Sequence, residues 1–88
     1  MIVLDYHYDD GRGWLAVDGG ILSHIGIKPT DFRGDSVERA GLMYLDDRND
    51  MAVVLEAMEA SHMEYELDRI YDGMRSNIRD FDRIKGAR

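Results

Sequence analysis

The sequence contains no cysteine and a single proline, and it has no long hydrophobic segment. Without cysteine, the chain can form neither a disulfide framework nor a zinc site with thiolate ligands. No apolar run approaches the roughly 20 residues that a membrane-spanning helix needs, and the N-terminus lacks the basic and apolar regions of a secretion signal. We therefore expect no membrane association and a cytoplasmic location.

Basic residues are also scarce, and the two kinds of charge are separated along the chain. The 88 residues include 18 Asp and Glu but only 11 Lys and Arg, a net charge of −7. Residues 46–72 hold nine acidic side chains and two arginines, whereas residues 73–88 hold five basic and two acidic side chains. Because nucleic-acid binding needs clustered basic side chains, direct nucleic-acid binding is not expected. The separation indicates an acidic body with a basic C-terminal tail, a pattern that governs the choice of partner.

The length and composition predict one small folded domain. A chain of 88 residues has room for a single core, and 44% hydrophobic with 33% charged residues is typical of a folded protein. A chain of this size buries only about 60–65% of its unfolded surface, so its core is thin. We expect residues 1–72 to form one α+β domain and residues 73–88 to form a basic tail that docks on it.

Hydrophobic periodicity divides the domain into strands and helices. Alternating or continuous apolar residues predict four strands, at residues 2–8, 14–18, 40–45 and 63–70. A short helix is expected over residues 21–26 and a longer one from Asn49 or Asp50, as capping residues, to about His62. Residues 28–38 hold the only proline and are expected to form a connection. The β-β-α-β-α-β order predicts an α+β fold, with a four-stranded, mostly antiparallel sheet and the helices on one face.

The longer predicted helix has two apolar surfaces. Its inward face is expected to consist of Met51, Val54, Leu55, Met58 and His62. Val53, Ala57 and Ala60 project from its back, where a solvent-facing helix would normally carry charge. A partner or a second subunit can cover this back surface, and so can the C-terminal tail through Ile78 and Phe81.

No group of residues has the spacing of a catalytic, cofactor-binding or metal site. A cluster precedes the longer helix and consists of Asp46, Asp47, Asn49 and Asp50. A calcium loop that starts at Asp46 would need an oxygen ligand at its third position, which is Arg48. His7, His24 and His62 lie on separate elements at no ligand spacing, and no serine stands in a nucleophile motif. We therefore expect no metal, no cofactor and no enzymatic activity.

Acidic side chains form the candidate partner-binding surface. Along the predicted strand at residues 63–70 they alternate with apolar residues, so they share one face. The expected members of the surface, with two from the preceding helix, are Glu56, Glu59, Glu64, Glu66, Asp68 and Asp72. Like charges along one strand face repel each other at a small cost in stability. The surface is either a solvated face that keeps a small protein soluble or a site for a basic partner.

Several short motifs follow one another in a characteristic order. They are HYDDGRGWLAV, LSHIGI, YLDDRND and, near the C-terminus, SNIRDFDRI. This order resembles a family of small proteins of unknown function that bacteriophages and other bacterial mobile elements encode. The chain departs from the family pattern at Arg12, where the family has histidine, at Arg48, where it has an acidic residue, and in an insertion at residues 35–40.

The resemblance implies a protein that works inside a bacterial host cell, and it brings no activity with it. Small acidic phage proteins often bind and block a host protein. By this analogy we predict inhibition of a host defence or nucleic-acid-handling enzyme through the acidic surface, in an anti-CRISPR-like or similar anti-defence role. The alternative is a homodimeric structural or assembly module of a phage or mobile element, which would associate through Val53, Ala57 and Ala60 or through an exposed sheet edge.

Overall fold

The structure, a computed structural model, describes residues 1–87; Arg88 of the basic tail lies outside this range. Within the range, the chain forms six strands, two α-helices and two short 3₁₀ helices. In chain order they are β1 (Ile2–Tyr8), β2 (Gly13–Asp18), α1 (Gly19–His24), a 3₁₀ helix (Pro29–Asp31), β3 (Val37–Arg39), β4 (Leu42–Asp46), α2 (Asp50–Ala60), β5 (Tyr65–Tyr71), a second 3₁₀ helix (Asn77–Asp80) and β6 (Asp82–Arg83). None of the helices described is long and apolar enough to cross a membrane.

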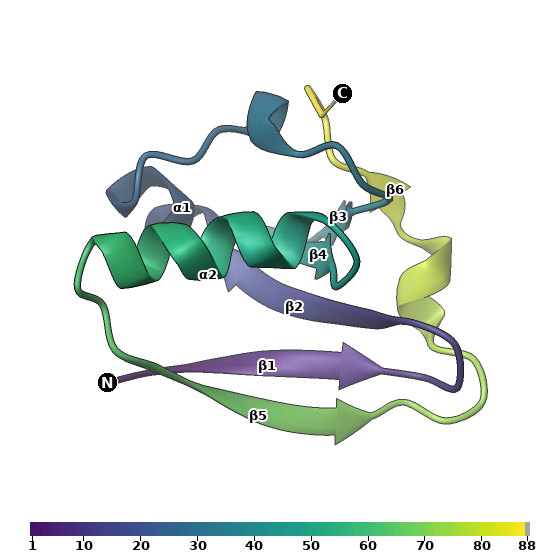
Figure 1. The fold of residues 1–88 in the computed structure, drawn as a ribbon. Helices are drawn as coiled ribbons and strands as arrows, with labels where there is room; N and C mark the ends of the chain where they lie inside the picture. The colour runs from purple at the N-terminus through teal and green to yellow at the C-terminus, as the bar shows by residue number, and fades with distance from the viewer. Residues whose placement is uncertain (88) are drawn as a thin grey trace.

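All six strands belong to one sheet, in the spatial order β5-β1-β2-β4-β3-β6 (Figure 1). β1 and β5 run parallel, and every other neighbouring pair is antiparallel. The α+β class is confirmed, but the prediction of four strands in the order β-β-α-β-α-β is wrong. The two additional strands, β3 and β6, have three and two residues, too few for an alternating pattern to be recognised in the sequence.

A tight hairpin joins β3 to β4, where the sequence predicts a connection and the start of a strand. Its two central residues, Ala40 and Gly41, both have left-handed backbone dihedrals, with φ of 52° and 82°. A two-residue hairpin turn of this kind favours Asn-Gly or Asp-Gly. Because alanine rarely adopts a positive φ, the Ala-Gly pair does not carry the usual turn signal. The strand predicted at residues 40–45 therefore starts two residues too early.

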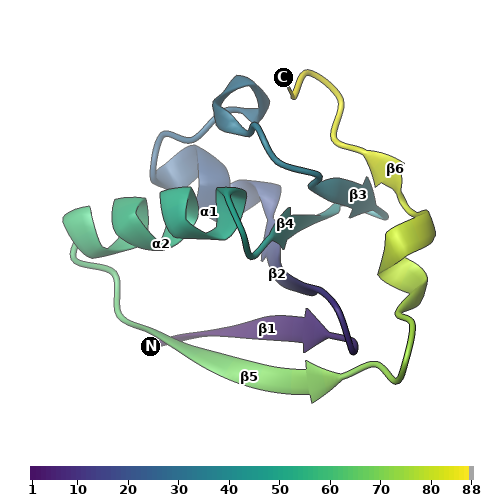
Figure 2. The ribbon, with the colours of Figure 1, turned by 45° about the vertical axis from the view of Figure 1, so that its right-hand side comes forward.

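Both α-helices cover the same face of the sheet, as expected, and this face holds the main core (Figure 2). Its buried residues are Leu4, Leu15, Val17, Leu22, Phe32, Leu45, Val54, Met58 and Ile84. Leu15 and Val17 alternate along β2 with Trp14 and Ala16, so they place the helices on one side of that strand. We call this side the helix face of the sheet.

The opposite face of the sheet carries a second, smaller core. Trp14, Val37 and Ile78 are buried together there, and Tyr44 and Phe81 pack against them. Ile78 and Phe81 belong to residues 73–87, which we call the C-terminal segment, so this segment covers part of the opposite face. The sequence left open whether Ile78 and Phe81 would cover the back of α2. In the structure these two residues pack on the opposite face of the sheet instead.

Helix α2 presents most of its predicted inward surface to the core. Val54 and Met58 are fully buried, and Met51 and Leu55 are half-buried. The prediction for His62 is wrong, because the helix ends at residue 60 and His62 lies exposed beyond it.

The end of α2 has the hydrogen bonds of a Schellman motif. The N–H of Met63 donates to the carbonyl of Met58 (2.9 Å), and the N–H of His62 donates to the carbonyl of Glu59 (3.0 Å). His62 occupies the left-handed position of the motif, with φ of 57°. Glycine usually fills this position because it has no Cβ to clash with the backbone. The histidine therefore hides the helix end from sequence reading.

Replacing His62 with glycine is expected to stabilise the protein. A left-handed conformation costs an L-residue about 1–2 kcal/mol, so His62→Gly should raise the free energy of unfolding by about 1 kcal/mol. Ser61 has φ of −91°, so Ser61→Gly is the matched control and should lower stability by about 0.5–1 kcal/mol. Urea denaturation measures both variants, and a less stable His62→Gly protein would contradict this helix end.

Candidate partner-binding surface

The face of β1 and β5 that points away from the helices is open and acidic. The two strands pair so that Asp5 lies beside Asp68, and Val3 lies beside Glu66. All four side chains are exposed, Val3 by 60%. Within residues 1–87, none of the three carboxylates takes part in a salt bridge. We call Asp5, Glu66 and Asp68 the acidic strip.

Asp5 is the member of the acidic strip that sequence reasoning missed. Alternation in β1 places Asp5 on the face opposite Leu4, and this is its only local signal. Its neighbour Asp68 lies far along the chain, and only the parallel pairing of β1 with β5 brings the two together.

The acidic residues predicted from the sequence do not all lie together. Glu66 and Asp68 belong to the acidic strip, and the exposed Glu64 immediately precedes β5. Glu56 and Glu59 are exposed on α2, which packs on the helix face of the sheet. The structure thus brings together the members that come from β5 and separates those that come from the helix.

The apolar residues predicted for the back of α2 are only partly accessible. Val53 and Ala57 are half-buried, and Ala60 is exposed. The large hydrophobic side chains that are exposed within residues 1–87 lie elsewhere: Met1, Val3, Leu42, Tyr71 and Met74. The back of α2 therefore offers little apolar area to a partner.

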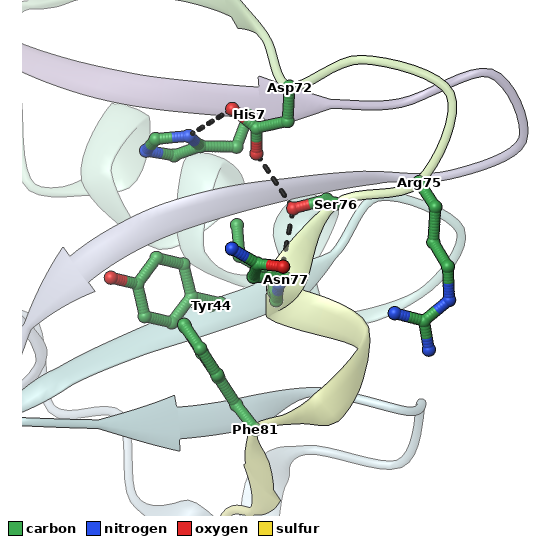
Figure 3. Close-up of a pocket in the computed structure, with 8 residues that line it drawn as sticks. His7, Tyr44, Asp72, Arg75, Ser76, Asn77 and Phe81 are labelled. Carbon is green, nitrogen blue, oxygen red and sulfur yellow. Dashed lines mark hydrogen bonds and ion pairs between the residues drawn. The ribbon is translucent and has the colours of Figure 1, made fainter.

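Asp72, the last of the predicted acidic residues, lies in a pocket at the end of β1 (Figure 3). The pocket has a volume of about 280 Å³, and its lining includes His7, Tyr44 and Asp72 together with the C-terminal segment. Oδ1 of Asp72 is 3.2 Å from Nδ1 of His7, and its Oδ2 accepts a hydrogen bond from the hydroxyl of Ser76 (2.8 Å).

The order of these three side chains differs from that of a catalytic triad. In a Ser-His-Asp triad the histidine stands between the serine and the carboxylate and takes the serine proton. Here Asp72 stands between His7 and Ser76, and the Ser76 hydroxyl also accepts the N–H of Ile78 (3.1 Å). Ser76 is only 1% exposed. The arrangement fastens the C-terminal segment to β1 and does not pair a nucleophile with a base.

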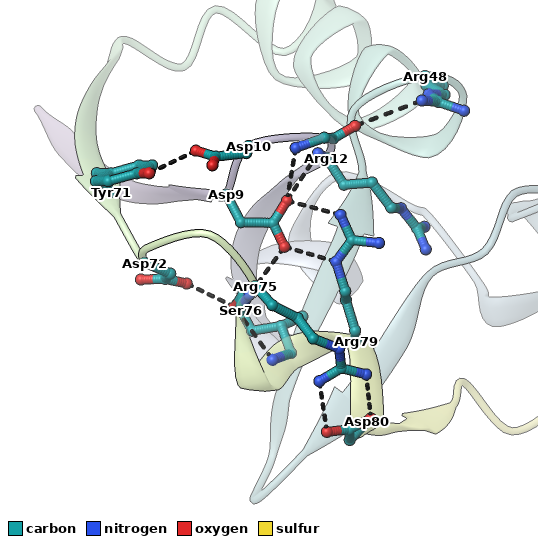
Figure 4. A network of polar contacts seen from close by, with 12 residues as sticks. Asp9, Asp10, Arg12, Arg48, Tyr71, Asp72, Arg75, Ser76, Arg79 and Asp80 are labelled. Atoms are coloured by element: carbon teal, nitrogen blue, oxygen red, sulfur yellow. Dashed lines mark hydrogen bonds and ion pairs between the residues drawn. The ribbon is translucent and has the colours of Figure 1, made fainter.

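A buried carboxylate, Asp9, joins the β1–β2 turn to the C-terminal segment (Figure 4). Its carboxylate accepts hydrogen bonds from the backbone N–H groups of Gly11 (3.0 Å), Arg12 (2.9 Å) and Ser76 (2.8 Å). It also accepts hydrogen bonds from Nε (2.6 Å) and Nη2 (2.8 Å) of the Arg79 guanidinium. These hydrogen bonds, first of all those from Arg79, hold the pKa of Asp9 well below its usual range. One side chain therefore fixes both the turn and the segment that covers the opposite face.

Two arginines of the C-terminal segment form ion pairs with carboxylates that do not belong to the acidic strip. Arg75 forms an ion pair with Asp80 (2.7 Å), and Arg79 forms one with Asp9 (2.6 Å). Arg83 donates to a backbone carbonyl of the connection before β3 (3.4 Å). Arg75 and Arg79 therefore do not form ion pairs with the acidic strip.

A second buried carboxylate, Asp50, anchors the connection before β3. It accepts the N–H of Arg33 (2.8 Å), the N–H of Gly34 (3.1 Å) and the hydroxyl of Ser36. Asn49 occupies the N-cap position of α2, as predicted, but no capping hydrogen bond from its side chain to the helix backbone forms, and the Asp50 carboxylate bonds to the connection instead. Within the described part of the chain, no group of three or more His, Cys, Asp or Glu is arranged to hold a metal ion.

On the helix face, the ends of β1 and β5 carry three tyrosines in contact. The ring centroids of Tyr6 and Tyr8 are 5.9 Å apart, and those of Tyr8 and Tyr71 are 5.3 Å apart. The Tyr6 hydroxyl donates to Asp47 (2.7 Å), and burial together with this hydrogen bond raises the pKa of Tyr6 to about 12. The Tyr71 hydroxyl donates to Asp10. The carboxylates of Asp10 and Asp47 are therefore engaged away from the acidic strip.

No protein-family model, curated protein or solved structure matches the chain. The resemblance to the phage-encoded family therefore stays a prediction.

Replacing Asp9 with asparagine is expected to destabilise the fold and to change its response to acid. In asparagine an NH₂ group replaces one of the two carboxylate oxygens, so it would face N–H groups that now donate hydrogen bonds to Asp9. The melting temperature should therefore fall by on the order of 10 °C. Because the folded-state pKa of Asp9 lies below its ordinary value of 3.8, its stabilisation is present above that pH and is lost as the pH falls further.

Thermal melts between pH 7 and pH 2 test this expectation. The Asp9→Asn variant should lose less stability below about pH 4 than the unchanged protein does. Asp10→Asn is the control, because Asp10 is exposed and its one hydrogen bond comes from Tyr71. Equal acid sensitivity in the unchanged protein and in Asp9→Asn would show that Asp9 does not link turn and segment.

Proposed function

We propose that this protein binds a host protein through the acidic strip and inhibits it, as a phage-type accessory protein. The proposed target is a defence or nucleic-acid-handling enzyme of the bacterial host cell. In this role the protein acts by occupying a surface of its target, and it needs no cofactor, metal or catalytic residue of its own.

The observation that carries the proposal is the juxtaposition of Asp5 and Asp68. Like charges directly beside each other on paired strands lower stability, here by on the order of a few tenths of a kcal/mol. The cost is avoidable, since a neutral or basic residue at either position would remove it. Functional sites can retain residues that lower the stability of the fold, and we infer that Asp5 and Asp68 are retained for binding.

The form of the acidic strip suits a basic channel in the target. Glu66 and Asp68 are two residues apart on one strand, so their Cα atoms are about 6.6 Å apart along it, and Asp5 lies alongside on the next strand. A row of carboxylates can occupy a channel that otherwise binds the phosphates of a nucleic acid. Opposite charges on the two partners would speed their encounter and fix their relative orientation.

A homodimeric assembly module is the alternative function, and the geometry supports it less. Val53 and Ala57 are already half-buried in the single chain, which leaves little apolar surface for a second copy on α2. Light scattering at micromolar concentration separates the two proposals. A stable dimer that Ala57→Glu dissociates would favour the assembly module, and a monomer would favour the inhibitor.

Reversing charge within the acidic strip is expected to slow association with the target. Affinity purification from bacterial lysate would supply the target, and the association rate of the purified pair would be measured at increasing salt. The double variant Glu66→Lys/Asp68→Lys should associate about tenfold more slowly at low salt, with a flatter salt dependence. The variant should remain folded, because the lysine introduced at position 68 would lie beside Asp5 with opposite charge.

Glu56→Lys/Glu59→Lys is the matched control for this experiment. It changes the net charge by the same amount, but both residues lie on α2 at the helix face. This control should associate at nearly the rate of the unchanged protein. If both double variants slow association equally, only net charge matters and the acidic strip is not the binding site.

A further inference from the structure

The free edge of β5 exposes backbone groups that no other strand satisfies. Among residues 1–87, β5 is the outermost strand at its end of the sheet and pairs only with β1 (Figure 1). It has seven residues, whereas the strand at the other edge, β6, has two. An exposed edge of this length is a template for pairing with another extended chain.

The hydrogen bonds to β1 show which backbone groups of β5 point outward. Glu64 accepts the N–H of Ile2 (3.1 Å), and Asp72 donates its N–H to Tyr8 (2.7 Å). Residues of a paired strand alternate between the two sides, so the even-numbered residues of β5 bond to β1. The outward groups therefore belong to Tyr65, Leu67, Arg69 and Tyr71.

The side chains of β5 determine what a strand added to this edge would meet. Glu66 and Asp68 belong to the acidic strip, so one face of the added strand would lie beside carboxylates. Tyr65 and Leu67 pack against the main core, and the exposed Arg69 lies over the Tyr6 ring on the same face. The other face of the added strand would therefore lie beside apolar and aromatic groups and one arginine. A complementary strand alternates basic and apolar residues.

The same charges oppose pairing of β5 with a second copy of itself. In an antiparallel pair with full overlap, Asp68 would lie directly opposite Asp68 of the second copy. If the second copy is shifted by two residues in one direction along β5, Asp68 lies opposite Glu66. If it is shifted by two residues in the other direction, Arg69 lies opposite Arg69. Like charges directly opposite each other destabilise strand pairing, so each of these registers is disfavoured.

We propose that β5 binds its partner by strand addition, and that the partner segment is an extended chain with Lys or Arg at every second position. This inference rests on the proposed function and specifies how the target is held. The backbone of the segment pairs with the outward groups of Leu67 and Arg69, while its basic side chains lie beside Glu66 and Asp68. Backbone pairing supplies affinity, and the alternating side chains supply specificity.

A synthetic peptide tests strand addition without knowledge of the natural target. The probe is a nine-residue, end-capped peptide in which Lys and Val alternate between terminal threonines. Hydrogen exchange followed by NMR should show the amides of Leu67 and Arg69 slowed about tenfold at millimolar peptide, since they gain a hydrogen bond. A scrambled peptide of the same composition should give no such protection. If the alternating peptide does not protect these two amides, the proposal is wrong.

Removal of an outward N–H separates strand addition from simple charge attraction. Arg69→Pro removes the side chain that lies over Tyr6, as Arg69→Ala also does, and in addition a backbone N–H that faces solvent. Loss of an outward N–H is compatible with an edge strand. Arg69→Pro should weaken peptide binding at least about tenfold relative to Arg69→Ala, which keeps the N–H. If Arg69→Pro does not fold, as judged by circular dichroism, Tyr71→Pro compared with Tyr71→Ala gives the same test at the exposed end of β5.

The two proposals fail in distinguishable ways. If Arg69→Pro and Arg69→Ala bind the peptide equally while Glu66→Lys/Asp68→Lys loses it, strand addition is wrong and the acidic strip remains the binding surface. If peptide binding survives the double reversal as well, both proposals are wrong. If Arg69→Pro and the double reversal both lose the peptide, and Glu56→Lys/Glu59→Lys keeps it, both are supported.

Discussion

Strand β2 is buried on both of its faces, and the rest of the structure follows from the need to cover it. Trp14, Leu15, Ala16 and Val17 are consecutive in β2 and all buried, so apolar side chains leave it on both sides. Burial of a large apolar side chain contributes about 1.5–3 kcal/mol, which makes exposure of either side costly. Both helices cover one side, and the C-terminal segment is what remains of a short chain to cover the other.

The carboxylate of Asp9 makes this second layer specific. The segment that contains Ile78 and Phe81 contributes few apolar side chains, so its position depends on a polar anchor. Asp9 supplies that anchor by accepting hydrogen bonds from Ser76 and Arg79 while it also closes the β1–β2 turn. Removing one partner from such a buried network leaves the others unsatisfied, and for that reason the network acts as a unit.

Incomplete cover of the opposite face creates the surface on which the proposed function rests. The C-terminal segment packs on β2, β3 and β4 and leaves the same face of β1 and β5 exposed around Asp5, Glu66 and Asp68, where polar residues are favoured. Here the polar residues have one sign of charge, and the edge of β5 is long and unpaired. Natural proteins usually protect such an edge with charged side chains. Charges of one sign also prevent self-pairing while they leave the edge open to a basic partner, so protection and selectivity have the same physical origin.

Local patterns in the sequence determined the α+β class, the strand at β1, the alternation of β5 and the buried surface of α2 around Val54 and Met58. These features depend on side chains a few residues apart, and a period of two or 3.6 reveals them directly. Local patterns misplaced the β3–β4 turn and the end of α2, because in each a residue that rarely adopts a positive φ occupies a left-handed position. Alanine stands at a turn where Asn is typical, and His62 stands at a helix end where glycine is typical.

Tertiary structure alone decided which charges meet. Asp5 lies beside Asp68 because β1 and β5 pair across nearly the whole chain, and Glu56 and Glu59 lie apart because α2 packs on the other face. The same holds for Asp9 and Arg79, and for Asp50 and the connection that it anchors. Sequence periodicity places a residue on a face of its own element. It carries no information about which element comes to lie beside that face, since that choice depends on how the whole core is buried.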